Sequence, residues 1–107
     1  MKKIILMLFS ILVINACTST KNVPFNEVEA SLNQKYGTLS NEYYRILENP
    51  IAEKDRKSML GKFENFRTEV KDLKKNRKDQ TANETRVFNS FIDKSSTNIQ
   101  YLNDLGE

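Results

Sequence analysis

Cys17 is the one thiol in this chain of 107 residues, and its side chain has the widest range of possible chemistry. A single thiol can act as a nucleophile, ligate a metal or carry a lipid, but it has no second cysteine with which to form a disulfide within the chain. The sequence contains no histidine, so the usual general base near neutral pH and the imidazole metal ligand are both missing. A catalytic site would therefore depend on carboxylates.

The carboxylates are spaced as on the exposed faces of helices. Glu53 has Lys57 four positions on, and Glu64 has Arg67 three positions on, which is the spacing of ion pairs along a helix. No glycine-rich phosphate loop is present. We predict no catalytic residue, no metal site, no cofactor and no small-molecule substrate. The alternative is a hydrolase that uses two paired carboxylates.

The tyrosines are the other side chains that could recognise a ligand. Their spacing is more typical of helix seams than of a sugar-binding platform. Tyr43 and Tyr44 are adjacent, so on a helix they must face different ways. One of the two is expected at the surface, and we predict a partner contact at Tyr43 and Tyr44.

The start of the chain resembles an export signal. Lys2 and Lys3 form a short basic segment, and residues 4–16 are almost entirely apolar. Thirteen helical residues span about 20 Å, which is short of the roughly 30 Å hydrocarbon core of a bilayer. A basic segment followed by a short apolar one is typical of a signal peptide, which we place at residues 1–16.

The end of this segment resembles the lipobox of bacterial lipoproteins. Ile14 is the aliphatic residue three positions before Cys17 and Ala16 is the small residue directly before it, whereas Asn15 stands where the lipobox usually has a small residue. The resemblance covers residues 1–17 and implies cleavage between Ala16 and Cys17. It also implies that diacylglycerol is linked to the Cys17 thiol and that an acyl chain such as palmitate is added to the new amino terminus. An ordinary signal peptide with a chance cysteine and an uncleaved anchor are the alternatives.

A lipid at Cys17 would place the protein in the cell envelope. One acyl chain binds a membrane only marginally at ~0.8 kcal/mol per buried CH₂, whereas two or three chains form a durable anchor. In similar lipoproteins an Asp after the cysteine favours retention in the inner membrane. This chain has Thr18 there, which favours the outer membrane if the cell has one.

The rest of the chain is expected to be all-α. Residues recur mostly at steps of three and four along three mainly apolar stripes, which is typical of helices with narrow, coiled-coil-like seams. The predicted seam positions are Phe25, Val28, Leu32, Tyr36, Leu39, Tyr43 and Ile46; Ala52, Arg56, Met59, Phe63, Phe66, Val70 and Leu73; and Val87, Phe88, Phe91, Ile92, Ile99, Leu102 and Leu105. We predict a flexible tether at residues 17–24 and an antiparallel, up-down-up three-helix bundle at residues 25–107. Its helices are expected at about 25–48, 50–78 and 81–105.

Local signals mark the expected helix ends. Asn49 and Pro50 are expected to end the first helix and to start the second, with Asn49 as the cap and Pro50 in the first turn. Thr81 and Glu84 fit a capping box for the third helix, and Gly106 could close it.

Three features should weaken this bundle. Gly37 lies inside the first helix, Arg56 and Gly61 interrupt the seam of the second, and the polar residues 95–98 interrupt the third. The third helix is therefore expected to pack poorly or bend at its centre. A small bundle with few large apolar side chains is marginally stable alone, so a homo-oligomer is plausible.

Charge is spread unevenly along the chain. Without Lys2 and Lys3 the 17 basic residues become 15 against 14 acidic ones, a balance that does not favour nucleic-acid binding. The middle helix is basic and ends in a cluster of five cations: Lys71, Lys74, Lys75, Arg77 and Lys78. The cluster could offset the acids Glu27, Glu29 and Glu84 at the same end of the bundle, or it could contact an anionic membrane surface.

These features favour a lipid-anchored envelope protein that works by binding. We expect a non-catalytic helical interaction or scaffold module, with the membrane as one partner and a protein or a second copy as another. A small helical surface adhesin is the first alternative. A cell-wall-active enzyme is the second, and a groove with converging carboxylates would favour it.

Overall fold

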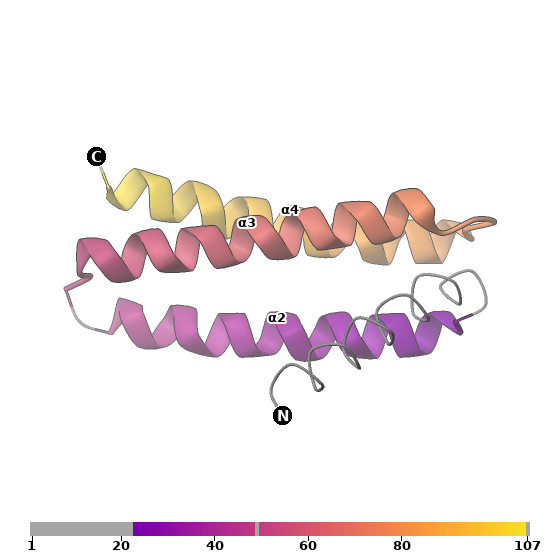
Figure 1. Ribbon diagram of the computed structural model, residues 1–107, viewed down its shortest axis with the longest axis horizontal. Coiled ribbons are helices and arrows are strands. Elements are labelled where there is room, and N and C mark those ends of the chain that lie inside the picture. Colours follow the sequence, from indigo (N-terminus) through magenta and orange to yellow (C-terminus); the bar gives the residue numbers. More distant parts are fainter. Residues whose placement is uncertain (1–22, 49, 107) are drawn as a thin grey trace, which may run out of the picture.

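The computed structural model describes residues 23–48 and 50–106, which form three helices. The chain order is α2 (Phe25–Leu47), α3 (Glu53–Asn76) and α4 (Ala82–Leu105). Figure 1 shows them running side by side in alternating directions. No strand occurs in the described ranges. The predicted all-α, up-down-up three-helix bundle is therefore confirmed, while the predicted signal peptide, Cys17 and residues 18–22 of the tether lie outside the described residues.

The alternating directions give the bundle two different ends. The proximal end, as we call it, contains Val23, the start of α2, the end of α3 and the start of α4. The distal end contains the end of α2, the start of α3 and the end of α4.

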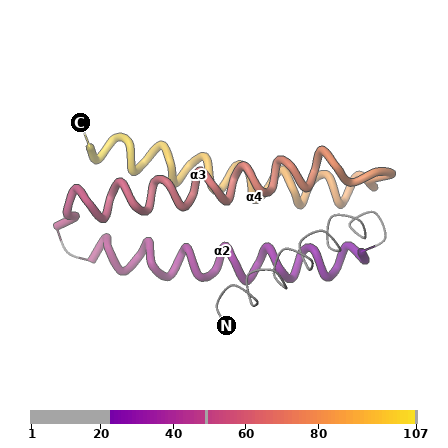
Figure 2. The backbone as a smooth tube through the Cα atoms, in the orientation of Figure 1, coloured from indigo at the N-terminus to yellow at the C-terminus, as the bar shows by residue number. Residues whose placement is uncertain are grey.

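The three helices do not pack equally closely. α3 and α4 form the tightest pair, α2 contacts α3 less extensively, and α2 contacts α4 least. In Figure 2 the tubes of α3 and α4 overlap in the half of the bundle that contains the end of α3, and the end of α4 lies beside the start of α3, whereas α2 runs apart from them. The docking of α2 therefore depends on a limited set of side chains.

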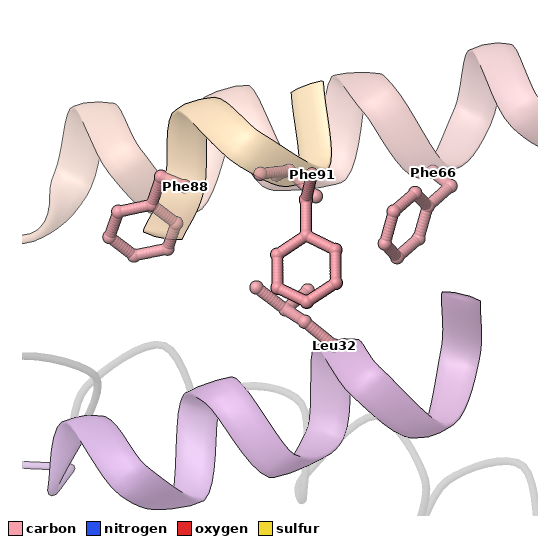
Figure 3. Packing of buried hydrophobic residues seen from close by; sticks show 5 residues of the cluster. Leu32, Phe66, Phe88 and Phe91 are labelled. Atoms are coloured by element: carbon pink, nitrogen blue, oxygen red, sulfur yellow. The ribbon is translucent and has the colours of Figure 1, made fainter. Parts of the chain in front are cut away.

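The core consists of two clusters, one toward each end. Figure 3 shows the proximal cluster, in which Leu32 of α2 and Phe91 of α4 point toward each other. Its buried members are Leu32, Phe66, Val70, Phe88 and Phe91. The buried members of the distal cluster are Tyr43, Met59, Phe63, Ile99 and Leu102. All ten occupy predicted seam positions, because only a step of three or four residues keeps successive side chains on one helix face.

A polar layer separates the two clusters. Ser95 of α4 is fully buried there, and its hydroxyl has no hydrogen-bond partner among the described residues. Asn98 Nδ2 donates to the Tyr36 hydroxyl at 3.0 Å, and Arg67 Nη1 donates to Ser96 Oγ at 3.1 Å. α4 continues through this layer without a break. The polar residues that were expected to disrupt the third helix instead contribute to a layer in which most polar side chains are hydrogen-bonded. Among the described residues, the Ser95 hydroxyl is the one buried side-chain group without a partner.

The start of α3 differs from the prediction. The helix begins at Glu53 after the cap residue Ala52, which is extended (φ −71°, ψ 140°) and makes no side-chain capping bond. Asn49 lies outside the described residues, and Pro50 precedes the helix, so the expected start at Pro50 is wrong. Carboxylates in the first turn, Glu53 and Asp55, interact favourably with the positive end of the helix dipole and replace the missing cap.

The other helix ends follow the sequence more closely. The Thr81 side chain accepts a hydrogen bond from Glu84 N at 3.1 Å, which confirms the first half of the capping box. The Glu84 carboxylate does not complete the box, since it is paired with Arg77. α3 ends at Asn76, two residues early, because Arg77 is extended and Asp79 has a φ of 57°. α4 is closed by Gly106, as predicted.

Gly37 provides a test of the continuity of α2. A Cβ built at Gly37 meets nothing within 4 Å, so Gly37→Ala adds no clash and removes the entropic cost of glycine in a helix. We expect the variant to raise the free energy of unfolding in urea by about 1 kcal/mol.

Gly106→Ala is the matched control. Its Cβ would meet the Arg56 guanidinium, and Gly106 follows the last residue of α4, so no gain is expected. A loss of stability in Gly37→Ala would show that α2 is not a regular helix at this position.

Candidate functional site

At the proximal end Arg77 is held inside the bundle. Its Nε bonds to Glu84 Oε1 at 3.2 Å, its Nη1 donates to the Val23 carbonyl at 2.9 Å, and its guanidinium lies 5.3 Å from the centre of the Phe25 ring. Only 13% of the side chain is exposed. Arg77 therefore joins the start of α2 to α3 and α4 and is not available to a membrane surface.

This geometry decides part of the interpretation of the basic cluster. Arg77 forms an ion pair with Glu84, as predicted by the interpretation in which the cluster neutralises nearby acidic residues. Glu27 and Glu29 take no part in any of the ion pairs of the described residues. Neutralisation of nearby acids therefore accounts for Arg77 and Glu84, but it does not account for the four lysines of the cluster.

The four lysines of the cluster remain at the surface. Lys71, Lys75 and Lys78 are exposed, and the half-buried Lys74 donates from Nζ to Asn89 Oδ1 at 2.8 Å. A hollow of about 480 Å³ lies here between α3 and α4. Its lining residues are Lys71, Lys74, Lys75, Gln80, Asn89 and Ile92. We call it the lysine hollow.

At the distal end the two adjacent tyrosines separate as a helix requires. Tyr43 is buried in the distal cluster, whereas 64% of Tyr44 is exposed. The Tyr43 ring lies near those of Tyr44 and of Tyr101 on α4, with ring centres 5.6 Å apart for Tyr43–Tyr44 and 6.5 Å for Tyr43–Tyr101. Burial raises the pKa of the Tyr43 phenol, and the neighbouring phenols, Tyr101 first, raise it further.

Two of these aromatic side chains, Tyr44 and Tyr101, are exposed. Tyr44, Tyr101 and Leu105 are the exposed large apolar side chains of the described residues, and all three lie in the distal half of the bundle. Tyr101 and Leu105 are four residues apart on α4 and share a face. We call these three residues the tyrosine surface. The sequence predicted that one of Tyr43 and Tyr44 is at the surface. It did not single out Tyr101, which was interpreted as a seam or rim residue, or Leu105, which was assigned to the apolar stripe of the third helix.

Arg56 has a structural role at the distal end that the sequence did not indicate. Its Nη1 donates to the Leu102 carbonyl at 3.1 Å and its Nε donates to Glu53 at 3.0 Å. The hydrogen bond from Arg56 also lowers the pKa of the Glu53 carboxyl. Arg56 therefore satisfies a carbonyl in the last turn of α4, where intrahelical partners are missing.

The two predicted intrahelical ion pairs are replaced by other contacts. Glu53 is paired with Arg56 and not with Lys57. Arg67 donates to Ser96 of α4, and Glu64 takes part in no ion pair of the described residues. The first pair is thus replaced by another pair along α3, and the second by a contact between α3 and α4, which spacing alone does not reveal.

A second concavity lies between α2 and α3. This groove of about 500 Å³ has a single carboxylate among its lining residues, Glu69, which is paired with Lys35. A second pair, Lys62 with Glu42 at 2.6 Å, also joins the two helices. The groove therefore lacks the two converging carboxylates that a hydrolase of the predicted alternative type requires. Within the described ranges no group of three or more Cys, Asp or Glu could hold a metal ion.

None of the helices in the described part of the chain is both long and apolar enough to cross a membrane. No protein-family model, curated protein or solved structure matches this chain.

Because Arg77 bonds to Glu84 and Val23, its substitution should destabilise the bundle more than substitution of a neighbouring lysine. Arg77→Gln removes the bonds to Glu84 and to the Val23 carbonyl, and hydrogen bonds to charged groups contribute about 2 kcal/mol. We expect a loss of that size in urea unfolding, with faster amide hydrogen exchange in the first turn of α2.

Lys78→Gln is the control for the loss of one charge, and its effect should stay within about 0.5 kcal/mol. Equal, small effects of both substitutions would contradict the structural role of Arg77.

Proposed function

We propose that this chain is a lipid-anchored bacterial envelope protein that works as a non-catalytic helical interaction module. A lipid on Cys17 would hold the proximal end near the bilayer, in the outer membrane where the cell has one. The bundle would present the tyrosine surface to a protein partner. The observation that carries this proposal is the position of the tyrosine surface in the distal half of the bundle, away from Val23.

The dimensions support such a separation. Arg77 fixes the chain at Val23, and the six residues from Cys17 to Val23 reach at most about 21 Å at ~3.5 Å each. Tyr44 follows Pro24 by 20 residues of helix, which is about 30 Å at ~1.5 Å per residue. The tyrosine surface would thus lie beyond the headgroup layer, within reach of other envelope proteins.

The chemistry of the tyrosine surface suits a protein partner. Tyrosine offers a broad apolar ring and a hydroxyl that can hydrogen-bond, and aromatic residues are enriched in the centres of protein interfaces. Attachment to the membrane would raise the local concentration of the module near membrane partners, so that a modest intrinsic affinity suffices. A second copy of the chain could occupy the same surface.

The anchor is tested by metabolic labelling with a fatty-acid analogue. We expect the wild-type chain to be labelled and to sediment with membranes, and we expect Cys17→Ser to remain unlabelled, since the thiol is the point of attachment. Equal absence of label in both proteins would contradict the lipid anchor.

The interaction surface is tested separately in the same cells. A photoreactive residue at Tyr44 should give a discrete crosslinked product that disappears when Tyr101→Ser is added. The matched control is the same probe at Lys54, which is exposed at the distal end but is not part of the tyrosine surface. Identical products from both positions, unaffected by Tyr101→Ser, would contradict a specific contact.

A further inference from the structure

The lysine hollow combines three cations with no carboxylate. Lys71, Lys74 and Lys75 belong to α3, and Asn89 and Ile92 of α4 form the opposite wall. Asp72 and Asp93 are close in sequence but do not line the hollow. A concave site with three ammonium groups and no acid among its lining residues favours an anion.

The charges of these three lysines are not neutralised by carboxylates of the described residues. None of the three takes part in an ion pair of the described residues. Cations near a helix C-terminus often serve to satisfy its last carbonyls, but here the side chain of Gln80 does so. Its Nε2 donates to the carbonyls of Lys74 and, at 3.0 Å, of Arg77. The lysines are therefore free to bind a ligand.

The arrangement of the donors is suited to a compact group with several oxygens. Lys71 and Lys75 are one helical turn apart, so their ammonium groups can approach the same ligand. Lys74 is oriented by its bond to Asn89 Oδ1. Each ammonium has three donors and no acceptor, and lysine is a common ligand of phosphate.

We propose that the lysine hollow binds a phosphate group. The phosphate could belong to the headgroup of an anionic phospholipid or to a free phosphate ion. The hollow lies in the proximal half of the bundle, and the lipid source rests on the proposed function, because only an anchored proximal end is held at the bilayer. Binding of free phosphate does not depend on the anchor.

The test uses the full chain carrying Cys17→Ser, so that no lipid is attached, with two double variants. Lys71→Gln/Lys75→Gln removes two charges from the hollow. Lys54→Gln/Lys57→Gln removes two exposed charges near the start of α3 at the distal end. Net charge is equal in the two variants, and the apolar residues 4–16 contribute equally to membrane binding in both.

The first arm measures binding to phosphatidylcholine vesicles doped with phosphatidylglycerol or, at equal surface charge, with oleate. We expect the hollow variant to bind phosphatidylglycerol vesicles about 30-fold more weakly than its parent, since the loss of the hydrogen bonds from one ammonium group to the phosphate costs about a factor of five. The distal variant should bind like its parent. Binding to oleate vesicles should be weaker and similar in both variants.

The second arm follows amide NMR shifts during titration with sodium phosphate, against sodium chloride at equal ionic strength. Shifts confined to the hollow that disappear in the hollow variant would support the site. If they occur while both variants bind vesicles equally, the phosphate source is the free ion. The proposal would be overturned if no shifts occur in the hollow and the two variants also bind phosphatidylglycerol vesicles equally, whether or not both bind more weakly than the parent. Because both arms use the Cys17→Ser chain, their results do not depend on whether the wild-type chain is labelled by the fatty-acid analogue.

Discussion

Tyr36 connects α2 to both core clusters and to the polar layer between them. α2 is the least tightly packed helix, and Tyr36 packs against both core clusters. Its ring centre lies 5.9 Å from that of Phe66 and 6.1 Å from that of Phe91. Its hydroxyl accepts a hydrogen bond from Asn98. An aromatic ring with a satisfied hydroxyl is well suited to a layer where apolar and polar groups meet.

Two arginines hold the ends of the bundle in the same way. Arg56 and Arg77 lie near opposite ends of α3, and each donates to a backbone carbonyl on another segment: Leu102 for the first and Val23 for the second. Each is also paired with a carboxylate. α3 therefore connects the end of α4 at the distal end with the start of α2 at the proximal end. Since the guanidinium offers several donors in a fixed plane, arginine can make both contacts at once.

The sequence was sufficient to predict the helices but not their contacts. The spacing of apolar residues predicted all three elements, and the buried core residues lie at predicted seam positions. The start of α3 was misplaced because Asn49 and Pro50 carry strong local signals, whereas the observed cap residue, Ala52, carries none. Arg77 and Lys78 look alike in the sequence. Only the fold shows that Arg77 lies beside Glu84 and Phe25.

The proposed function and the lipid source of the phosphate both depend on the bundle standing with its proximal end at the membrane, and the depth of two labels tests this most directly. In a lipid-anchored chain reconstituted into vesicles, a fluorophore would be attached at Lys78→Cys or Tyr44→Cys, and quenching by a headgroup-labelled lipid would be measured. Lys78 and Tyr44 are both exposed and lie in opposite halves of the bundle. The account predicts strong quenching at position 78 and weak quenching at position 44. Equal quenching at both positions, or stronger quenching at position 44, would contradict it.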